Sequence, residues 1–266
     1  MEYDWADDAR KSYEVGIAAL RERLEKSRVI IGDCVLYNAD CRFILPTLHN
    51  VDLVATDPPY GIGYKTNYRT ASATPDILMG DNEEAIDYVP DLVRAVKSGG
   101  AIYICSRFDV SAAWLAKLAY AGAKIKTPIV WDKGNHTAGD LRGDYGCRTE
   151  LILFASKGRH ILRNGRDINL WHIPRPAAGE HPTPKPVALM ERILINSSDR
   201  GDTILDPFMG TSPIGEAAVN LGRKYIGIEI NKRYFDLACE RIRAAHARSF
   251  QLDINEATCS YSQITS

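Results

Sequence analysis

The sequence predicts a single α/β domain, built on one doubly wound, mostly parallel sheet with helices on both faces. Short apolar runs of strand length alternate with segments of helical periodicity along most of the 266 residues. Two of these runs, 51–56 and 225–228, are followed at once by an acidic side chain, at the place where open α/β sheets bind ligands. A hydrophobic content of 45% and a charged content of 25% fit such a globular chain.

The expected elements follow one another in a regular order. A charged amphipathic pattern over 7–26 has Tyr13, Ile17, Leu20 and Leu24 at helical spacing, and we expect this helix to pack on the domain. Seven strands are expected at 34–38, 51–56, 101–105, 125–131, 151–155, 202–206 and 225–229. Helices are expected between them, one ending near 48 and the others at 83–96, 110–121, 186–197, 214–221 and 232–247. The polar tail after about 252 is expected to fray.

The tetrapeptide Asp57-Pro58-Pro59-Tyr60 directly follows the apolar run 51–56. That run is typical of a buried parallel strand, so a carboxylate, a rigid turn and an aromatic ring emerge at its carboxyl end. The two prolines fix the backbone and remove two N–H donors, which leaves the local carbonyls as outward acceptors. An acceptor-rich turn beside a stackable ring suits a planar base that carries an NH2 group. A turn that only ends the strand is the alternative.

A second motif at 202–213 opens with a short strand, passes through a tight glycine-containing turn and enters a helix. Ser212 is expected to cap this helix, because its hydroxyl suits the N-cap and Pro213 suits the first helical position. The next strand ends in Glu229. Asp206 and Glu229 are spaced like the acids of a nucleoside-binding βαβ unit, in which the second acid holds ribose hydroxyls.

Together the two motifs resemble those of the S-adenosylmethionine-dependent DNA amino-methyltransferases. Their order resembles the beta group, in which the catalytic motif precedes the cofactor motif, and 181–186 (His-Pro-Thr-Pro-Lys-Pro) and 221–229 also read like that family. The resemblance covers about residues 29–245 and implies a seven-stranded, Rossmann-like methyltransferase sheet with a small recognition insert. One departure stands out: the family usually has Gly-Ser-Gly-Thr at 210–213, where this chain has Gly-Thr-Ser-Pro. Loss of the second glycine puts close approach of the cofactor in question.

The resemblance implies S-adenosylmethionine as cofactor and gives roles to the matching positions. Glu229 is expected on the ribose, and Asp40 with Cys41 near the adenine. Thr183 and Lys185 are expected near the methionine carboxylate. The remaining cofactor-binding candidates are Asp57, Asp206, Phe208, Gly210, Thr211 and Ser212.

The chemistry starts from the target amine, whose lone pair is delocalised into the base. Accepting hydrogen bonds from both N–H groups moves the nitrogen toward a tetrahedral, attacking geometry. Asp57 accepts one through its carboxylate and Pro58 the other through its carbonyl, while Tyr60 stacks on the base and Pro59 completes the rigid turn. Because the sulfonium already activates the methyl group, direct in-line displacement needs mainly positioning. A base in a duplex has to be flipped out to reach this site.

Positive charge is concentrated in the middle of the chain, although the formal net charge is -1. We therefore expect 134–180 to be the target-recognition region, with arginines that mostly contact phosphates. The long polar loop 61–80 directly follows the catalytic tetrapeptide, and we expect it to be mobile and functional. The candidate DNA contacts are Lys65, Arg69, Arg142, Arg159, Arg163 and Arg166.

Several other classes are disfavoured. None of the six cysteines follows a proline, so the Pro-Cys nucleophile of the cytosine carbon-5 methyltransferases is missing, and no Cys-x-x-Cys spacing occurs. The six histidines form no zinc-protease pattern, so no metal is expected. No apolar stretch reaches the length of a membrane span and the first residues are acidic, so a cytoplasmic protein without a membrane partner is expected.

The expected function is thus a site-specific adenine-N6 methyltransferase that acts on double-stranded DNA, as in restriction–modification systems. An aspartate at the head of the tetrapeptide favours adenine by resemblance, with cytosine N4 as the alternative. A catalytically impaired DNA-binding relative is a second alternative, motivated by the missing glycine. Methylation of RNA or of a protein amide is a third, since related tetrapeptides serve those substrates. The recognition sequence, a restriction partner and the choice between monomer and homodimer stay open.

Overall fold

The computed structural model describes residues 22, 24–59, 83–136, 142–143, 145–175 and 185–264, the side chains of 83–85 and 252–264 excepted. Outside these residues lie most of the expected helix 7–26, the loop 61–80 with Lys65 and Arg69, Tyr60 and Thr183.

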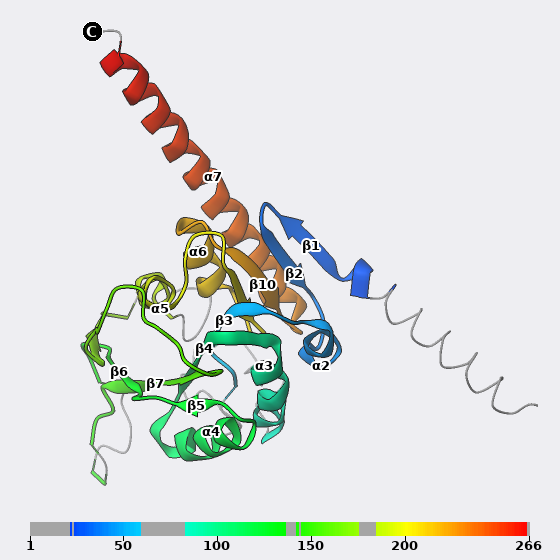
Figure 1. The fold of residues 1–266 in the computed structure, drawn as a ribbon, viewed down its shortest axis with the longest axis vertical. Helices are drawn as coiled ribbons and strands as arrows, with labels where there is room; N and C mark the ends of the chain where they lie inside the picture. Colours follow the sequence, from blue (N-terminus) through cyan, green and yellow to red (C-terminus); the bar gives the residue numbers. More distant parts are fainter. Residues whose placement is uncertain are drawn as a thin grey trace, which may run out of the picture.

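Ten strands form one sheet within the described residues. In chain order they are β1 (Arg28–Ile31), β2 (Cys34–Tyr37), β3 (Val51–Thr56), β4 (Val96–Ser106), β5 (Lys124–Ile125), β6 (Ile129–Asp132), β7 (Thr149–Ser156), β8 (Leu170–His172), β9 (Thr203–Asp206) and β10 (Lys224–Ile228). Across the sheet the order is β1-β2-β10-β9-β3-β4-β7-β6-β8, and β5 pairs with β7 off this path (Figure 1). The five strands from β2 to β4 in this order are parallel, whereas β7 is antiparallel to β4 and β6 to β7. The predicted α/β class with a mostly parallel sheet is confirmed.

The sheet has three more strands than the seven predicted. The additional β1, β5 and β8 contain four, two and three residues, too few for a periodic pattern to stand out. The expected strand 125–131 is split into β5 and β6. The residues between them end in Pro128, which has no N–H to give to a strand ladder.

Helices cover both faces of the sheet (Figure 1). On one face lie α2 (Cys41–Ile44), the 3-10 helices η1 (Leu45–Thr47) and η2 (Glu83–Tyr88), α3 (Val89–Ala95) and α4 (Phe108–Tyr120). On the other lie α5 (Val187–Ser197), α6 (Pro213–Asn220) and α7 (Lys232–Ile264). Strand β3 serves both cores, since Leu53 and Ala55 belong to one and Val51 and Val54 to the other. This double burial explains why the run 51–56 is apolar almost throughout.

Helix α7 continues to Ile264, well beyond the expected end at 247. It packs on α6, β1 and β2, and then extends past the body of the domain (Figure 1). The expectation of a frayed tail after about 252 is therefore wrong.

The topology gathers functional segments at one edge of the sheet. Because β2, β10, β9, β3 and β4 are parallel, the residues that follow them lie along a common edge, which we name the carboxyl edge. Strand β7 runs the opposite way, so its first residues lie at this edge too, and so do the last residues of β6. The opposite edge, where the parallel strands begin, is named the amino edge.

Candidate active site

Asp57 stands half-buried at the carboxyl edge, directly after β3, and is followed by Pro58 and Pro59. Its Oδ2 accepts a hydrogen bond from Lys185 Nζ at 2.7 Å, and the Lys185 side chain is only 7% exposed. Lys185 comes from the segment that precedes α5, far along the chain. The expected catalytic tetrapeptide and the expected cofactor segment are thus joined by one ion pair.

Asp206 ends the neighbouring strand β9 and is fully buried. Its Oδ1 accepts hydrogen bonds from Thr56 Oγ1 at 2.8 Å and from the backbone N–H of Phe208 at 3.2 Å, and its Oδ2 accepts from the Tyr225 hydroxyl at 3.4 Å. Burial raises the pKa of Asp206 to about 7, and the charge of nearby Asp57 adds to the rise. All three donors are neutral, so none of these hydrogen bonds to Asp206 comes from a cation.

Glu229 follows β10 and holds the turn 207–212 between β9 and α6, which is expected to bind the cofactor and which we name the cofactor loop. Its Oε2 accepts from the backbone N–H of Gly210 at 2.9 Å and its Oε1 from that of Asn231 at 2.7 Å. Burial raises the pKa of Glu229. Gly210 has φ +51°, a left-handed conformation that glycine adopts without steric cost. Each carboxylate oxygen keeps a free lone pair, so Glu229 can accept further hydrogen bonds from hydroxyl groups.

Ser212 occupies the N-cap position of α6, but its hydroxyl does not cap the helix. The hydroxyl instead donates to the Tyr225 hydroxyl at 3.0 Å in the core, and the residue is fully buried. The predicted capping role is therefore wrong. Ser212 has φ +60°, so at the position of the family's second glycine this chain keeps the left-handed backbone and turns the side chain inward. Neighbouring Thr211 is buried as well.

Asp40 and Cys41, the two residues expected near the adenine, lie in different environments, and Phe208 is a further cofactor candidate. Asp40 follows β2 and caps α2: its Oδ1 accepts from the backbone N–H of Arg42, and its Oδ2 pairs with the Arg42 guanidinium at 2.6 Å. Cys41 points into the core, and burial raises the pKa of its thiol to about 12. Phe208 is half-buried, with its ring centroid 5.9 Å from that of Tyr88.

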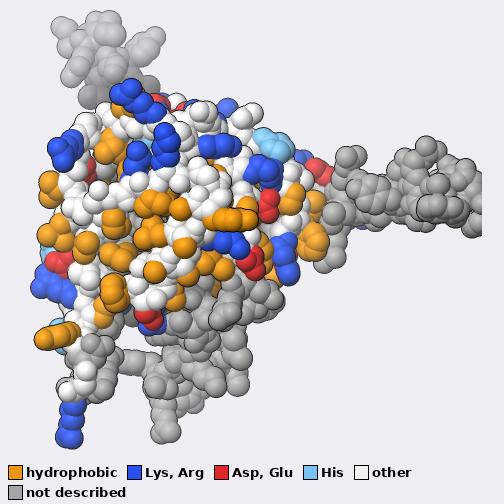
Figure 2. Space-filling view, turned by 60° about the horizontal axis from the view of Figure 1, so that its bottom comes forward, with side chains coloured by type: hydrophobic (Ala, Val, Ile, Leu, Met, Phe, Trp, Pro, Cys, Tyr) orange, Lys and Arg blue, Asp and Glu red, His pale blue; other side chains and the backbone are white. Residues whose placement is uncertain are grey.

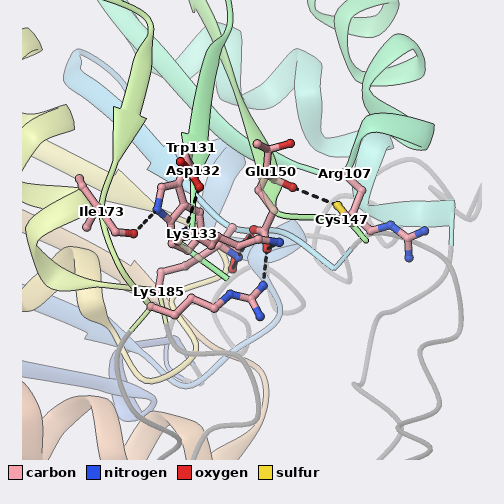
Figure 3. Close-up of polar contacts among 12 residues, drawn as sticks. Arg107, Trp131, Asp132, Lys133, Cys147, Glu150, Ile173 and Lys185 are labelled. Carbon is pink, nitrogen blue, oxygen red and sulfur yellow. Dashed lines mark hydrogen bonds and ion pairs between the residues drawn. The ribbon is translucent and has the colours of Figure 1, made fainter. Parts of the chain in front are cut away.

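Glu150, which the sequence analysis missed, lies at the same edge. Arg175 Nη2 is 2.7 Å and Lys133 Nζ 3.2 Å from its Oε1, while Lys185 Nζ is 3.3 Å from its Oε2. Although burial alone raises the pKa of Glu150, the charges of Lys185, Lys133 and Arg175 outweigh it and lower the pKa to about 2. Figure 3 shows the Lys133 and Lys185 side chains beside Glu150. The sequence gives only a weak signal, because Glu150 lies near the start of a strand and reaches this edge only if that strand is antiparallel.

Three of the arginines expected to contact DNA, Arg159, Arg163 and Arg166, lie at the other edge of the sheet. The backbone N–H of Arg163 donates to the Asn196 carbonyl at 2.8 Å, and its Nε pairs with Asp199 at 2.6 Å, both near the end of α5. The segment 157–169 leaves β7 and enters β8 at the amino edge. The structure thus places Arg159, Arg163 and Arg166 at the edge opposite Asp57, and their expected contacts with DNA phosphates stay a prediction. Arg142 is exposed, in the connection between β6 and β7 at the carboxyl edge.

Basic side chains are dispersed on the face that Figure 2 presents. Among the described residues of that face, lysines and arginines lie apart from one another around apolar side chains. The described part of the chain contains no group of three or more His, Cys, Asp or Glu side chains arranged to hold a metal ion. None of the helices described is both long and apolar enough to cross a membrane.

Comparisons with known proteins agree with this geometry. A family model described as DNA methylase, for N6 and N4 enzymes, matches residues 51–240. The type II methyltransferase M2.DpnII of Streptococcus pneumoniae is 30% identical over 224 residues, which cover 73% of this chain and 83% of the relative. The DNA adenine methyltransferase YhdJ of Escherichia coli strain K12 is 28% identical over 232 residues, with 74% and 77% covered. The crystal structure of M1.HpyAVI in complex with S-adenosylmethionine superposes with a TM-score of 0.62 at 27% identity and covers 77% of this chain and 98% of that one. This chain belongs to the N6/N4 DNA methylase family.

Proposed function

We propose that this chain transfers a methyl group from S-adenosylmethionine to the exocyclic N6 amine of adenine in double-stranded DNA. The proposal rests on one observation: at the carboxyl edge of a DNA methylase fold, Lys185 is hydrogen-bonded to Asp57, and the charge of Asp57 lies near the buried Asp206. Adenine is favoured over cytosine because an aspartate leads the tetrapeptide and because the relative YhdJ is named an adenine methyltransferase.

The charges at the carboxyl edge suit this cofactor. S-adenosylmethionine supplies a methyl group activated by a sulfonium charge, and it also carries an ammonium and a carboxylate. Asp206 is a buried acid whose hydrogen bonds come from neutral donors, and so it lacks the cation that such a ligand would bring. Lys185, expected near the methionine carboxylate, lies at this edge with its ammonium between Asp57 and Glu150. Glu229, with acceptor capacity left on both oxygens, suits the ribose hydroxyls.

The catalytic step rests on hydrogen-bond acceptors. The Asp57 carboxylate accepts one N–H of the target amine and the Pro58 carbonyl the other, which directs the nitrogen lone pair at the methyl group. As the N–C bond forms, the S–C bond breaks and S-adenosylhomocysteine leaves as a neutral thioether, while the proton that the amine loses passes through its hydrogen bond with Asp57 to solvent. Because the leaving group is neutral, positioning supplies most of the rate. Tyr60 stacks on the flipped base in this proposal, and stacking offsets part of the cost of extrusion.

The duplex approaches the carboxyl edge in this proposal. Among the described residues, those that directly follow β6 and β8 lie at this edge, and we assign target recognition to the parts of 134–180 that continue from them, with Arg142 among the contacts. Lys65 and Arg69, which follow the tetrapeptide, are the further candidates. We place the protein in the cytoplasm, where it meets its DNA substrate.

The test is incubation with labelled S-adenosylmethionine and mixed-sequence duplex DNA, followed by digestion to nucleosides. Label in N6-methyldeoxyadenosine is expected. Label in N4-methyldeoxycytidine would support the cytosine alternative. DNA binding without any labelled nucleoside would support a catalytically impaired relative.

A further inference from the structure

Glu150 is half-buried, and its two carboxylate oxygens have different numbers of partners. Arg175 and Lys133 both bind its Oε1, at 2.7 and 3.2 Å. Its Oε2 is buried and has no hydrogen-bond partner among the residues that the structure describes. A buried acceptor without a donor is unfavourable, and one that faces a functional site calls for an explanation.

Lys185 lies between this oxygen and Asp57. Its Nζ donates to Asp57 Oδ2 at 2.7 Å and stands 3.3 Å from Glu150 Oε2, an ion pair that lacks hydrogen-bond geometry. The exposed fraction of the Lys185 side chain is 7%, and that of Glu150 is 13%. Of these two carboxylates, the ammonium therefore hydrogen-bonds to Asp57 and forms only an ion pair with Glu150.

The proposed reaction places a second demand on Asp57. Its carboxylate has to accept an N–H of the target amine, and the Lys185 ammonium competes for the same group. Moving a buried ammonium away from a carboxylate is costly unless another anion receives it. Glu150 Oε2 is an anionic acceptor within 3.3 Å of that ammonium.

We propose that Glu150 is a positioning residue, which takes over the Lys185 ammonium when the target amine reaches Asp57. Arg175 and Lys133 hold Oε1 in place, so that Oε2 keeps facing Lys185. The inference rests on the proposed function for the role of Asp57. It adds a movement of the Lys185 ammonium from Asp57 to Glu150, after which the Asp57 carboxylate can orient the amine.

The kinetic test is a double-mutant cycle with Glu150→Gln and Lys185→Met, measured at saturating cofactor and DNA. Glu150→Gln should lower kcat by about 10-fold or more, with KM for DNA changed by less than about 3-fold. In the Lys185→Met background the same change should lower kcat by less than about 2-fold, because the competing ammonium is gone. Glu150→Asp should restore part of kcat. The matched control is Asp167→Asn, which alters an acid paired with Arg192 at the amino edge and should leave kcat unchanged. An equal loss of kcat in both backgrounds would show a merely structural role and overturn the inference.

A crystal structure of the Asp57→Asn variant tests the proposed movement of Lys185 without an activity measurement. Lys185 Nζ should then donate to Glu150 Oε2 at about 3.0 Å or less. An ammonium that turns to solvent instead would overturn the inference, even in an active enzyme. A wild-type chain that transfers no methyl group would count against the proposed function alone.

Discussion

Two acids near the amino edge pair with cations, whereas two acids at the carboxyl edge do not, although Asp57 and Glu150 beside them do. At the amino edge, Asp167 is held by the Arg192 guanidinium at 2.8 Å and by Asn196, and the hydrogen bond from Arg192 leads the lowering of its pKa. Asp52 likewise pairs with Lys97 there. At the carboxyl edge, burial instead raises the pKa of Asp206 and Glu229. Acids that already have cations stabilise the fold, whereas acids buried without them are suited to receive a cationic ligand.

The largest expected contrast between the edges comes from strand β3, which has an acid near each end. Asp57→Ala should lower the methyl-transfer rate by about 100-fold or more, because a lost transition-state hydrogen bond acts on the chemical step. Cofactor affinity, measured by calorimetry, should stay within a few-fold. The control Asp52→Ala should reduce stability but keep the rate per folded molecule, since Asp52 holds Lys97 and the Thr203 N–H at the other edge. Turnover of Asp57→Ala close to wild type would remove this residue from the mechanism.

Glu229→Ala should weaken S-adenosylmethionine binding by roughly 10- to 100-fold, the range expected for a lost hydrogen bond to a charged group. The variant also frees the Gly210 N–H, so the cofactor loop loses its anchor. Calorimetric titration gives the affinity directly. Asp199→Ala removes the partner of Arg163 at the amino edge and serves as the control. Equal affinities of the two variants would show that the cofactor does not contact Glu229.

The pKa of Asp206, about 7, predicts a pH-dependent affinity for the cofactor. A cationic ligand binds the ionised carboxylate, and below pH 7 that proton has to be released first. Affinity should therefore fall by about 10-fold from pH 8 to pH 6, since one pKa unit corresponds to about 1.4 kcal/mol. Titrations in buffers of different ionisation enthalpy would also report the released proton. An Asp206→Asn variant should bind the cofactor weakly at both pH 6 and pH 8. If its affinity still depended on pH as in the wild type, the titrating group would be another residue.

Two variants of Ser212 distinguish an effect of backbone strain on stability from an effect of direct contact on cofactor affinity. Ser212→Ala and Ser212→Gly both remove the bond to Tyr225, but only glycine relieves the left-handed backbone. The alanine variant should therefore be less stable than the glycine variant by about 1 kcal/mol in urea denaturation. Cofactor affinity should be the same in both, because the hydroxyl points into the core. Much tighter binding by the glycine variant would mean that Ser212 obstructs the ligand.

The smallest effect is expected from the amino-edge arginines. Arg163→Ala should leave the salt dependence of DNA binding unchanged, because Arg163 is engaged by Asp199 far from the target site. Arg142→Ala should reduce the slope of log affinity against log salt concentration by roughly one unit, as expected for one lost phosphate contact. Affinities at several salt concentrations on cognate and scrambled duplexes would measure both. A reduced slope for Arg163→Ala alone would move the DNA surface to the amino edge.

The sequence predicted the fold and the family because those signals are local. The alternation of strands and helices and the order of the two motifs are contained in short segments, and the comparisons confirm the DNA methylase family that they implied. The expected cofactor and catalytic roles of individual residues stay predictions. The inward turn of Ser212 was missed because it depends on Tyr225 in the next strand.

The partners of Glu150 escaped the sequence analysis for a related reason. Lys133, Arg175 and Lys185 reach it from three different segments, and only the antiparallel course of β7 brings Glu150 to the carboxyl edge. The expected DNA contact at 157–169 rested on its cationic surplus alone and stays a prediction. A surplus of charge does not reveal whether arginines such as Arg163 are already held by acids of the same chain.

The most direct measurement is a crystal structure with S-adenosylhomocysteine and a duplex that contains the recognition sequence. We expect the duplex at the carboxyl edge, one adenine extruded with its N6 hydrogen-bonded to Asp57, and the cofactor ribose on Glu229. A duplex bound along the amino edge, or a cofactor that does not contact Glu229, would contradict the division of the molecule into a stabilising edge and a catalytic edge.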